Sequence, residues 1–192
     1  MRNSGHVTRT LLSSRKANGL LLVSRGSAGN IDPLAEDVTS GHCQIKAFNS
    51  TNGTSTPYDF TEDGLRLGWG LRNSVGIAED PSSGAIYSVE NSVDEIQRDG
   101  ENIHEDNPGE EMNFHGYLNG TATREQGQNY GYPTCFATWD VATVPKNENL
   151  QVGMQFAIGN QTEDDRVCQN ERISPQLTVR WFDSVLVRRK MH

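Results

Sequence analysis

Four short polar motifs between Leu67 and Pro133 contain residue types that can do chemistry. In chain order they are Gly70-Leu71-Arg72-Asn73, Ser88-Val89-Glu90-Asn91, Gly109-Glu110-Glu111-Met112-Asn113 and Asn129-Tyr130-Gly131-Tyr132-Pro133. A fixed arginine can stabilise negative charge, and backbone or carboxylate oxygens can bind a hard cation such as calcium. Near the start of the chain, His6 adds an imidazole that can act as a base near neutral pH. Each motif alone is a weak indication of function.

These motifs must be positioned by strands, because apolar and polar residues alternate over several short segments. The predicted strands are Leu20–Ser24, Gln44–Phe48, Asn73–Glu79, Ala85–Val89, Met112–Leu118, Gln151–Ile158 and Gln176–Phe182. The sequence Asp80-Pro81-Ser82-Ser83-Gly84 is typical of a turn and predicts a hairpin. The acidic segment Ile96–Gly109 is predicted to be a long surface loop. No window shows a sustained helical period, so the pattern indicates an all-β sandwich, barrel or propeller.

The order and spacing of the four motifs resembles the soluble quinoprotein glucose/sorbosone dehydrogenases. The family pattern consists of G-x-R-N, a D-P-x-(x)-G hairpin, a strand ending in E-(N/Q), an acidic D/E-E-x-N, and Y-G-(Y/W)-P. The segment from His6 to Leu12 is also similar to the histidine segment of that family, and the resemblance extends to about Thr178. The chain is most similar to the fungal pyranose dehydrogenase branch, which oxidises sugars such as glucosone and fucose.

The resemblance implies a six-bladed β-propeller that binds pyrroloquinoline quinone (PQQ) and calcium and oxidises a pyranose sugar at the anomeric carbon. His6 matches the general base, which takes the proton of the anomeric hydroxyl while hydride passes to PQQ. Arg72 matches the residue that hydrogen-bonds the quinone oxygen, and Asn73 and Arg9 are predicted to help bind the cofactor. The implied partners are the sugar and an electron acceptor such as a cytochrome.

The calcium ligands implied by the resemblance are backbone carbonyls just after the strand that carries Glu90. By position these belong to Ser92 and Val93, where bacterial relatives have Gly-Pro. Calcium favours oxygen donors, and a carbonyl ligand tolerates a change of side chain. Glu111 lies in the acidic motif and is predicted to lie on the substrate side, with its role left open.

Composition excludes two classes of partner. The net charge is −8 and the sequence pI about 5.1, which disfavours nucleic acid, because phosphate binding needs a basic surface. No apolar run approaches the ~20 residues of a membrane-spanning helix, so no membrane partner is predicted. Hydrophobic residues make up 34% of the chain and the mean hydropathy is −0.65, which indicates a loop-rich domain.

Sequons and cysteines favour an extracellular protein. The four N-x-[ST] sequons, which are candidate glycosylation sites, begin at Asn49, Asn52, Asn119 and Asn160. In an oxidising compartment Cys135 and Cys168 could form a disulfide, which leaves Cys43 unpaired; spacing does not establish that pairing. No cysteine lies in a CxxC pair, so a zinc site is not predicted.

The resemblance also implies that the chain is incomplete. The start has no apolar signal-peptide region, although the parent protein is expected to be secreted. Residues 1–178 are predicted to form a partial propeller of about three blades, followed by a divergent tail at 179–192. Half a propeller leaves unpaired strand edges. Two alternatives therefore stay open: a non-catalytic carbohydrate-binding propeller module, and an inactive structural fragment.

Overall fold

A computed structural model describes residues 5–7, 9–51, 56–158 and 165–169, in which short β-strands predominate. The first sheet contains β1 (Leu11–Ser13), β2 (Leu20–Arg25), β3 (Gln44–Asn49), β4 (Leu65–Trp69) and β10 (Gln128–Asn129). Strands β1 to β4 follow one another in antiparallel order, and β10 adds in parallel to β4. The sequence predicted β2 and β3 but missed the three shorter strands.

The second sheet is antiparallel and contains β5 (Ser74–Glu79), β6 (Ala85–Glu90) and β9 (Glu111–Tyr117). The turn between β5 and β6 is organised by Asp80, whose Oδ1 accepts from the backbone N–H of Ser83 at 2.6 Å. Gly84 closes this turn with a φ of +79°, a conformation that favours glycine. The predicted hairpin and the predicted strand that follows it are therefore confirmed.

Smaller elements complete the described chain. They are β7 (Gln97–Arg98), β8 (Glu101–Asn102), β11 (Cys135–Ala137), β12 (Gln155–Ala157), the 3₁₀ turns η1 (Pro33–Glu36), η2 (Val38–Ser40) and η3 (Val141–Thr143), and the helix α1 (Asp165–Cys168). The prediction of a long surface loop at Ile96–Gly109 was wrong in part. Ile96 and Ile103 are buried and flank the β7–β8 hairpin, so both ends of this hairpin are attached to the core.

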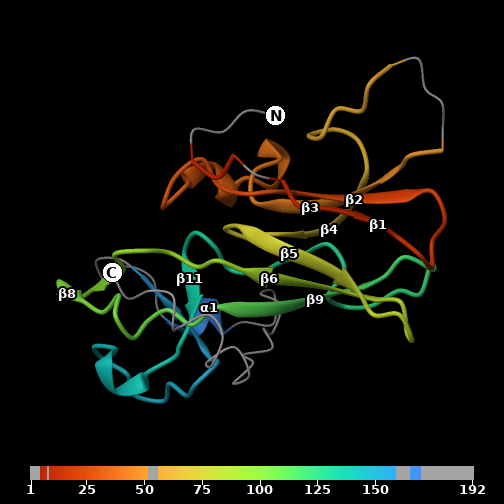
Figure 1. The fold of residues 1–192 in the computed structure, drawn as a ribbon. Helices are drawn as coiled ribbons and strands as arrows, with labels where there is room; N and C mark the ends of the chain where they lie inside the picture. The colour runs from red at the N-terminus through yellow and green to blue at the C-terminus, as the bar shows by residue number, and fades with distance from the viewer. Residues whose placement is uncertain (1–4, 8, 52–55, 159–164, 170–192) are drawn as a thin grey trace.

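The two larger sheets lie one above the other, with β1–β4 over β5, β6 and β9 (Figure 1). Between them is a core cluster to which Leu22, Ile45, Leu67 and Ile86 contribute fully buried side chains. The all-β prediction is confirmed. The described sheets form no closed barrel. Within the described residues no helix is long and apolar enough to cross a membrane.

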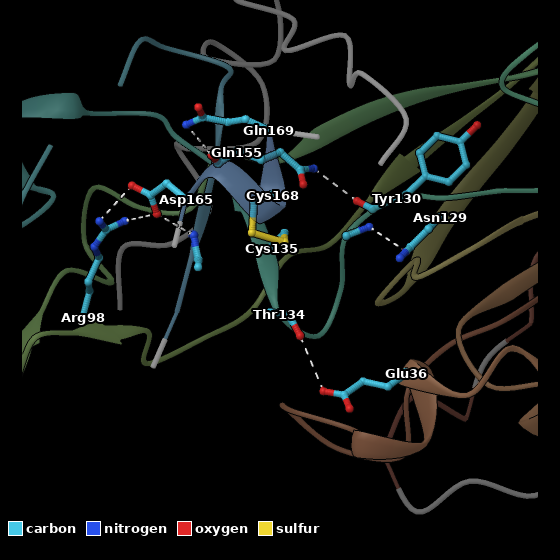
Figure 2. Close-up of a disulfide and its surroundings, with 12 residues drawn as sticks. Glu36, Arg98, Asn129, Tyr130, Thr134, Cys135, Gln155, Asp165, Cys168 and Gln169 are labelled. Carbon is cyan, nitrogen blue, oxygen red and sulfur yellow. Dashed lines mark hydrogen bonds and ion pairs between the residues drawn. A yellow bond between two sulfur atoms is a disulfide. The ribbon is translucent and has the colours of Figure 1, made fainter. Parts of the chain in front are cut away.

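A second core lies around β11 and β12, next to a disulfide between Cys135 and Cys168 (Figure 2). Arg98 forms a bidentate ion pair with Asp165 at 2.9 Å for both contacts, and Asp165 Oδ1 also accepts from the backbone N–H of Ala157. These contacts attach α1 to β7 and to β12. Cys43 is a free, buried thiol. Residues 170–192 lie outside the described part of the chain, and with them the predicted strand Gln176–Phe182 and the predicted tail. The sequons at Asn52 and Asn160 lie outside it as well.

Candidate active site

Arg72 lies just after β4 and is held in one orientation by its hydrogen bonds. Its guanidinium donates to the backbone carbonyl of Asn30 at 3.0 Å and to Asn30 Oδ1 at 2.8 Å. It also donates to the backbone carbonyl of Asn91 at 3.0 Å and to Asn91 Oδ1 at 3.1 Å. Nη2 of Arg72 also donates to Oδ2 of Asp94 at 3.4 Å. An arginine has five N–H donors, and here each of them has an acceptor. The result is a fixed, buried positive charge, with only 5% of the residue exposed.

His6 is half-buried beside the segment that follows β2. Its backbone N–H donates to the carbonyl of Ser27 at 3.0 Å, and its ring Nδ1 lies 2.7 Å from Ser27 Oγ. Nη1 of Arg9 donates to the His6 carbonyl at 2.8 Å. Burial lowers the pKa of His6, and the nearby charge of Arg72 lowers it further. A lowered pKa keeps the imidazole neutral near pH 7, which is the form that a base requires.

Gly26 brings the predicted residues together. A Cβ at this position would lie 2.8 Å from Asn73 Oδ1, 3.0 Å from His6 Cβ and 3.1 Å from the Arg72 carbonyl. The backbone N–H of Ser27 donates to that same carbonyl at 2.8 Å. His6, Arg72 and Asn73 therefore converge on a backbone that has no side chain. We call His6, Arg9, Gly26, Arg72 and Asn73 the His6–Arg72 site.

A small cavity of about 10 Å³ adjoins this site. Its lining includes Arg72, Glu90, Ser92, Glu111 and Tyr132. Such a volume holds roughly one water molecule. The cavity places two predicted residues, Ser92 and Glu111, on the same side of the fold as Arg72.

Two buried carboxyl groups in this region have raised pKa values. Burial raises the pKa of Glu90 to about 7, even though Ser74 Oγ and the backbone N–H of Asn73 donate to it at 2.5 and 3.1 Å. Burial, with the neighbouring charge of Glu90, raises the pKa of Glu111 well above its usual range. Glu111 is the first residue of β9 and its side chain is buried. It therefore differs from most glutamates, which lie in solvent at the protein surface.

The residues assigned to calcium have different environments. Ser92 donates its backbone N–H to Glu110 Oε2 at 2.8 Å, and Val93 packs in the second core, 3% exposed. In the described part of the chain, no group of three His, Cys, Asp or Glu side chains could hold a metal ion. A calcium site here would therefore depend on backbone carbonyls, and the assignment of Ser92 and Val93 stays a prediction.

Sequence reasoning missed the partners that orient the predicted residues. Asn30 is 42 positions from Arg72, and Ser27 is 21 positions from His6. Asn91 does lie in a motif noted from the sequence, but nothing there indicates that it contacts Arg72. Asparagines and serines in loops carry no sequence signal for such long-range contacts. Two sequon residues lie in the described chain: Asn119 is exposed, and Asn49 ends β3.

Comparison with known proteins gives the family. A family described as TrAA12-like matches residues 1–184, and the chain belongs to this family. A pyrroloquinoline quinone-dependent sugar dehydrogenase of Hypocrea jecorina is 52% identical over 181 residues. A pyrroloquinoline quinone-dependent pyranose dehydrogenase of Coprinopsis cinerea is 34% identical over 183 residues. Each alignment covers 92% of this chain. The similarity to fungal quinoprotein dehydrogenases is thereby confirmed.

Two solved structures share the fold. A calcium structure of a Trichoderma reesei enzyme of carbohydrate-active family AA12 superimposes with a TM-score of 0.84 at 51% identity. The holo form of the pyranose dehydrogenase PQQ domain from Coprinopsis cinerea gives 0.80 at 34% identity. The chain covers 44% and 43% of those structures, and 41% and 24% of the two curated relatives. It thus spans less than half of the length of these relatives.

Proposed function

We propose that the chain is part of a PQQ-dependent sugar dehydrogenase and that its cofactor binds at the His6–Arg72 site. The observation that carries this proposal is the convergence of His6, Arg72 and Asn73 on Gly26. Gly26, which has no side chain, lets His6, Arg72 and Asn73 pack closely together, and the fixed Arg72 charge suits an anionic quinone. The residues present therefore fit the cofactor by their charge. The relatives, which are named PQQ-dependent dehydrogenases, support the same assignment.

Each residue has a specific part in this proposal. PQQ, when bound, supplies the two-electron acceptor for the hydride of the sugar. His6 accepts the proton of the anomeric hydroxyl, for which its lowered pKa keeps it neutral. Arg72 would stabilise the cofactor through its charge, because its N–H donors already have acceptors in the chain, and Asn73 would help to hold it. Arg9, which was also predicted to help bind the cofactor, donates to the His6 carbonyl. Glu111 is assigned to the substrate side of the small cavity.

Calcium, the propeller and the location belong to the same proposal. The carbonyls of Ser92 and Val93 would bind calcium, an ion that prefers oxygen donors. The four antiparallel strands β1–β4 and the β5–β6–β9 sheet would be consecutive blades of a six-bladed propeller, of which residues 1–178 would supply about three. The protein would act outside the cell on a pyranose, and a cytochrome-type partner would accept its electrons. The sequons and the Cys135–Cys168 disulfide support this location.

The experiment is a PQQ titration of the chain, with and without calcium, followed by addition of fucose or glucosone. Binding is read from the cofactor absorbance, and sugar oxidation from its bleaching. Arg72→Gln keeps the size of the side chain similar but removes the charge, so it is expected to weaken PQQ binding at least tenfold. Arg124→Gln, at an exposed position outside the site, is the charge-matched control. Wild-type chain that does not bind PQQ would contradict the proposal for this chain.

A further inference from the structure

Ser27 has a single hydroxyl proton, and the structure shows where that proton goes. Ser27 Oγ lies 2.6 Å from the carbonyl oxygen of Gly29. A carbonyl oxygen only accepts hydrogen bonds, so a contact this short between two oxygens requires the Ser27 proton between them. Ser27 therefore donates to Gly29, and its Oγ faces other neighbours as an acceptor.

This assignment determines the protonation of His6. The ring Nδ1 of His6 lies 2.7 Å from Ser27 Oγ. Because the Ser27 proton is used at Gly29, the proton in the His6–Ser27 contact must come from Nδ1. A neutral imidazole carries one proton, so the lone pair then lies on Nε2.

We propose that Ser27 and Gly29 hold His6 in the Nδ1–H tautomer, which makes Nε2 the nitrogen that accepts the substrate proton. Ser27 is a positioning residue here, because it acts through His6. The inference rests on the proposed function for its catalytic consequence, while the tautomer itself follows from the hydrogen bonds alone. A hydroxyl thus does for this histidine what an adjacent carboxylate does in a catalytic triad.

The segment that carries Ser27 and Gly29 is fixed by a second set of buried groups. Asp32 accepts from the backbone N–H of Ala28 at 2.7 Å and from Nδ1 of His42 at 2.7 Å. Nη2 of Arg25 lies 2.6 Å from Nε2 of His42. An arginine only donates, so His42 must also be the Nδ1–H tautomer, with its proton directed at Asp32. Ser27 itself is fully buried, which keeps its hydroxyl away from competing water.

The neutral form of His6 depends on charges from several elements around it. Burial lowers the pKa of His6 most and the charge of Arg72 lowers it further, while a hydrogen bond to the Ser27 backbone and the charge of Asp94 raise it. Arg9 lies on the same segment and contacts the His6 carbonyl. The Tyr132 hydroxyl contacts both Ser27 and the Asn30 carbonyl, the latter at 3.0 Å, and because Ser27 donates to Gly29, the single Tyr132 proton goes to one of these two acceptors. These groups surround His6 but do not select between its two ring nitrogens, whereas Ser27 does.

The first test is a long-range ¹H–¹⁵N correlation spectrum of the labelled chain, above the pKa of His6. His6, assigned by its loss in His6→Ala, is expected to show a proton on Nδ1 and a lone pair on Nε2. His42 is the internal reference, because its partners require the same pattern. Ser27→Ala removes the hydroxyl but keeps the hydrogen bond between His6 and the Ser27 backbone, so it should raise the fraction of His6 protonated on Nε2 and leave His42 unchanged. A wild-type His6 with its proton on Nε2 would overturn the inference, and this result does not require PQQ to bind.

The second test is kinetic. Ser27→Ala is expected to lower the rate of sugar-dependent PQQ reduction about tenfold, with little change in PQQ affinity, since only the base is misoriented. Ser24→Ala is the matched control, because Ser24 is buried in the preceding strand and its hydroxyl contacts Thr10 and the Ser74 carbonyl instead of His6. Equal rates for Ser27→Ala and wild type would contradict the inference. A wild-type chain that binds no PQQ would contradict the proposed function alone, and the spectrum would still decide the tautomer.

Discussion

Substitution of Gly26 by alanine tests whether the His6–Arg72 site is as closely packed as the structure shows. The added Cβ would lie 2.8 to 3.1 Å from Asn73 Oδ1, His6 Cβ and the Arg72 carbonyl, where ordinary contacts between carbon atoms are ~3.5–4.0 Å. The Arg72 carbonyl is a backbone group that already accepts from Ser27 at 2.8 Å, so it cannot move aside freely. Overpacking of this kind costs about 1–3 kcal/mol.

The assay is thermal and urea unfolding of Gly26→Ala beside wild type, together with the PQQ titration. For a chain of this size the expected loss corresponds to a fall in Tm of roughly 3–10 °C. PQQ affinity should fall as well, since His6 and Asn73 are displaced. Gly109→Ala is the matched control, because its Cβ would meet nothing closer than 3.6 Å. If Gly26→Ala unfolds at the wild-type temperature and binds PQQ equally well, the packing argument is refuted.

Three further predictions concern stability. The Cys135–Cys168 disulfide closes a loop of 33 residues, so its reduction is expected to cost about 3.7 kcal/mol. The measurement is urea unfolding with and without reductant, and an unchanged midpoint would contradict the prediction. Arg98→Lys keeps the charge but loses the bidentate contact with Asp165 (Figure 2), so the free energy of unfolding in the same assay should fall by about 1 kcal/mol. An unchanged free energy of unfolding would show that the ion pair contributes nothing to stability. Glu90 has a pKa of about 7 in the folded chain, so the folded state binds the Glu90 proton more tightly than the unfolded state does. The free energy of unfolding should therefore fall as the pH rises from about 4.5 to 7. Glu90→Gln should flatten that decline, and an unchanged pH profile would refute this role of Glu90.

The strands that the sequence predicted are among the longer ones, with six or seven residues in β2, β3, β5, β6 and β9. In β3 and β6, apolar residues such as Ile45 and Ile86 alternate with polar ones, and the pattern is long enough to recognise. Strands β7, β8 and β10 have two residues each, so they show no period and were missed. The segment from Ile96 to Ile103 looked like a loop because its two buried side chains are separated by a polar hairpin.

The site was predicted only as far as its motifs reach. Arg72 and Asn73 came from a recognisable motif, and the structure brings them next to His6 through Gly26. Asn30 and Ser27 could not be predicted, because their roles arise from contacts between segments far apart in the chain. Tautomers and pKa values depend on burial and on partners, which a single sequence does not show.

The most direct measurement of the central claim compares His6→Ala with His104→Ala in sugar-dependent reduction of bound PQQ. His104 is exposed, and its ring Nδ1 lies 2.6 Å from Oδ1 of Asn102, away from the His6–Arg72 site. Loss of the His104 side chain should therefore leave the reaction unchanged. The account predicts that His6→Ala still binds PQQ but reduces it at least a hundredfold more slowly, as expected for removal of a general base. Equal rates for the two variants would contradict the assignment of His6 and, with it, the proposed active site.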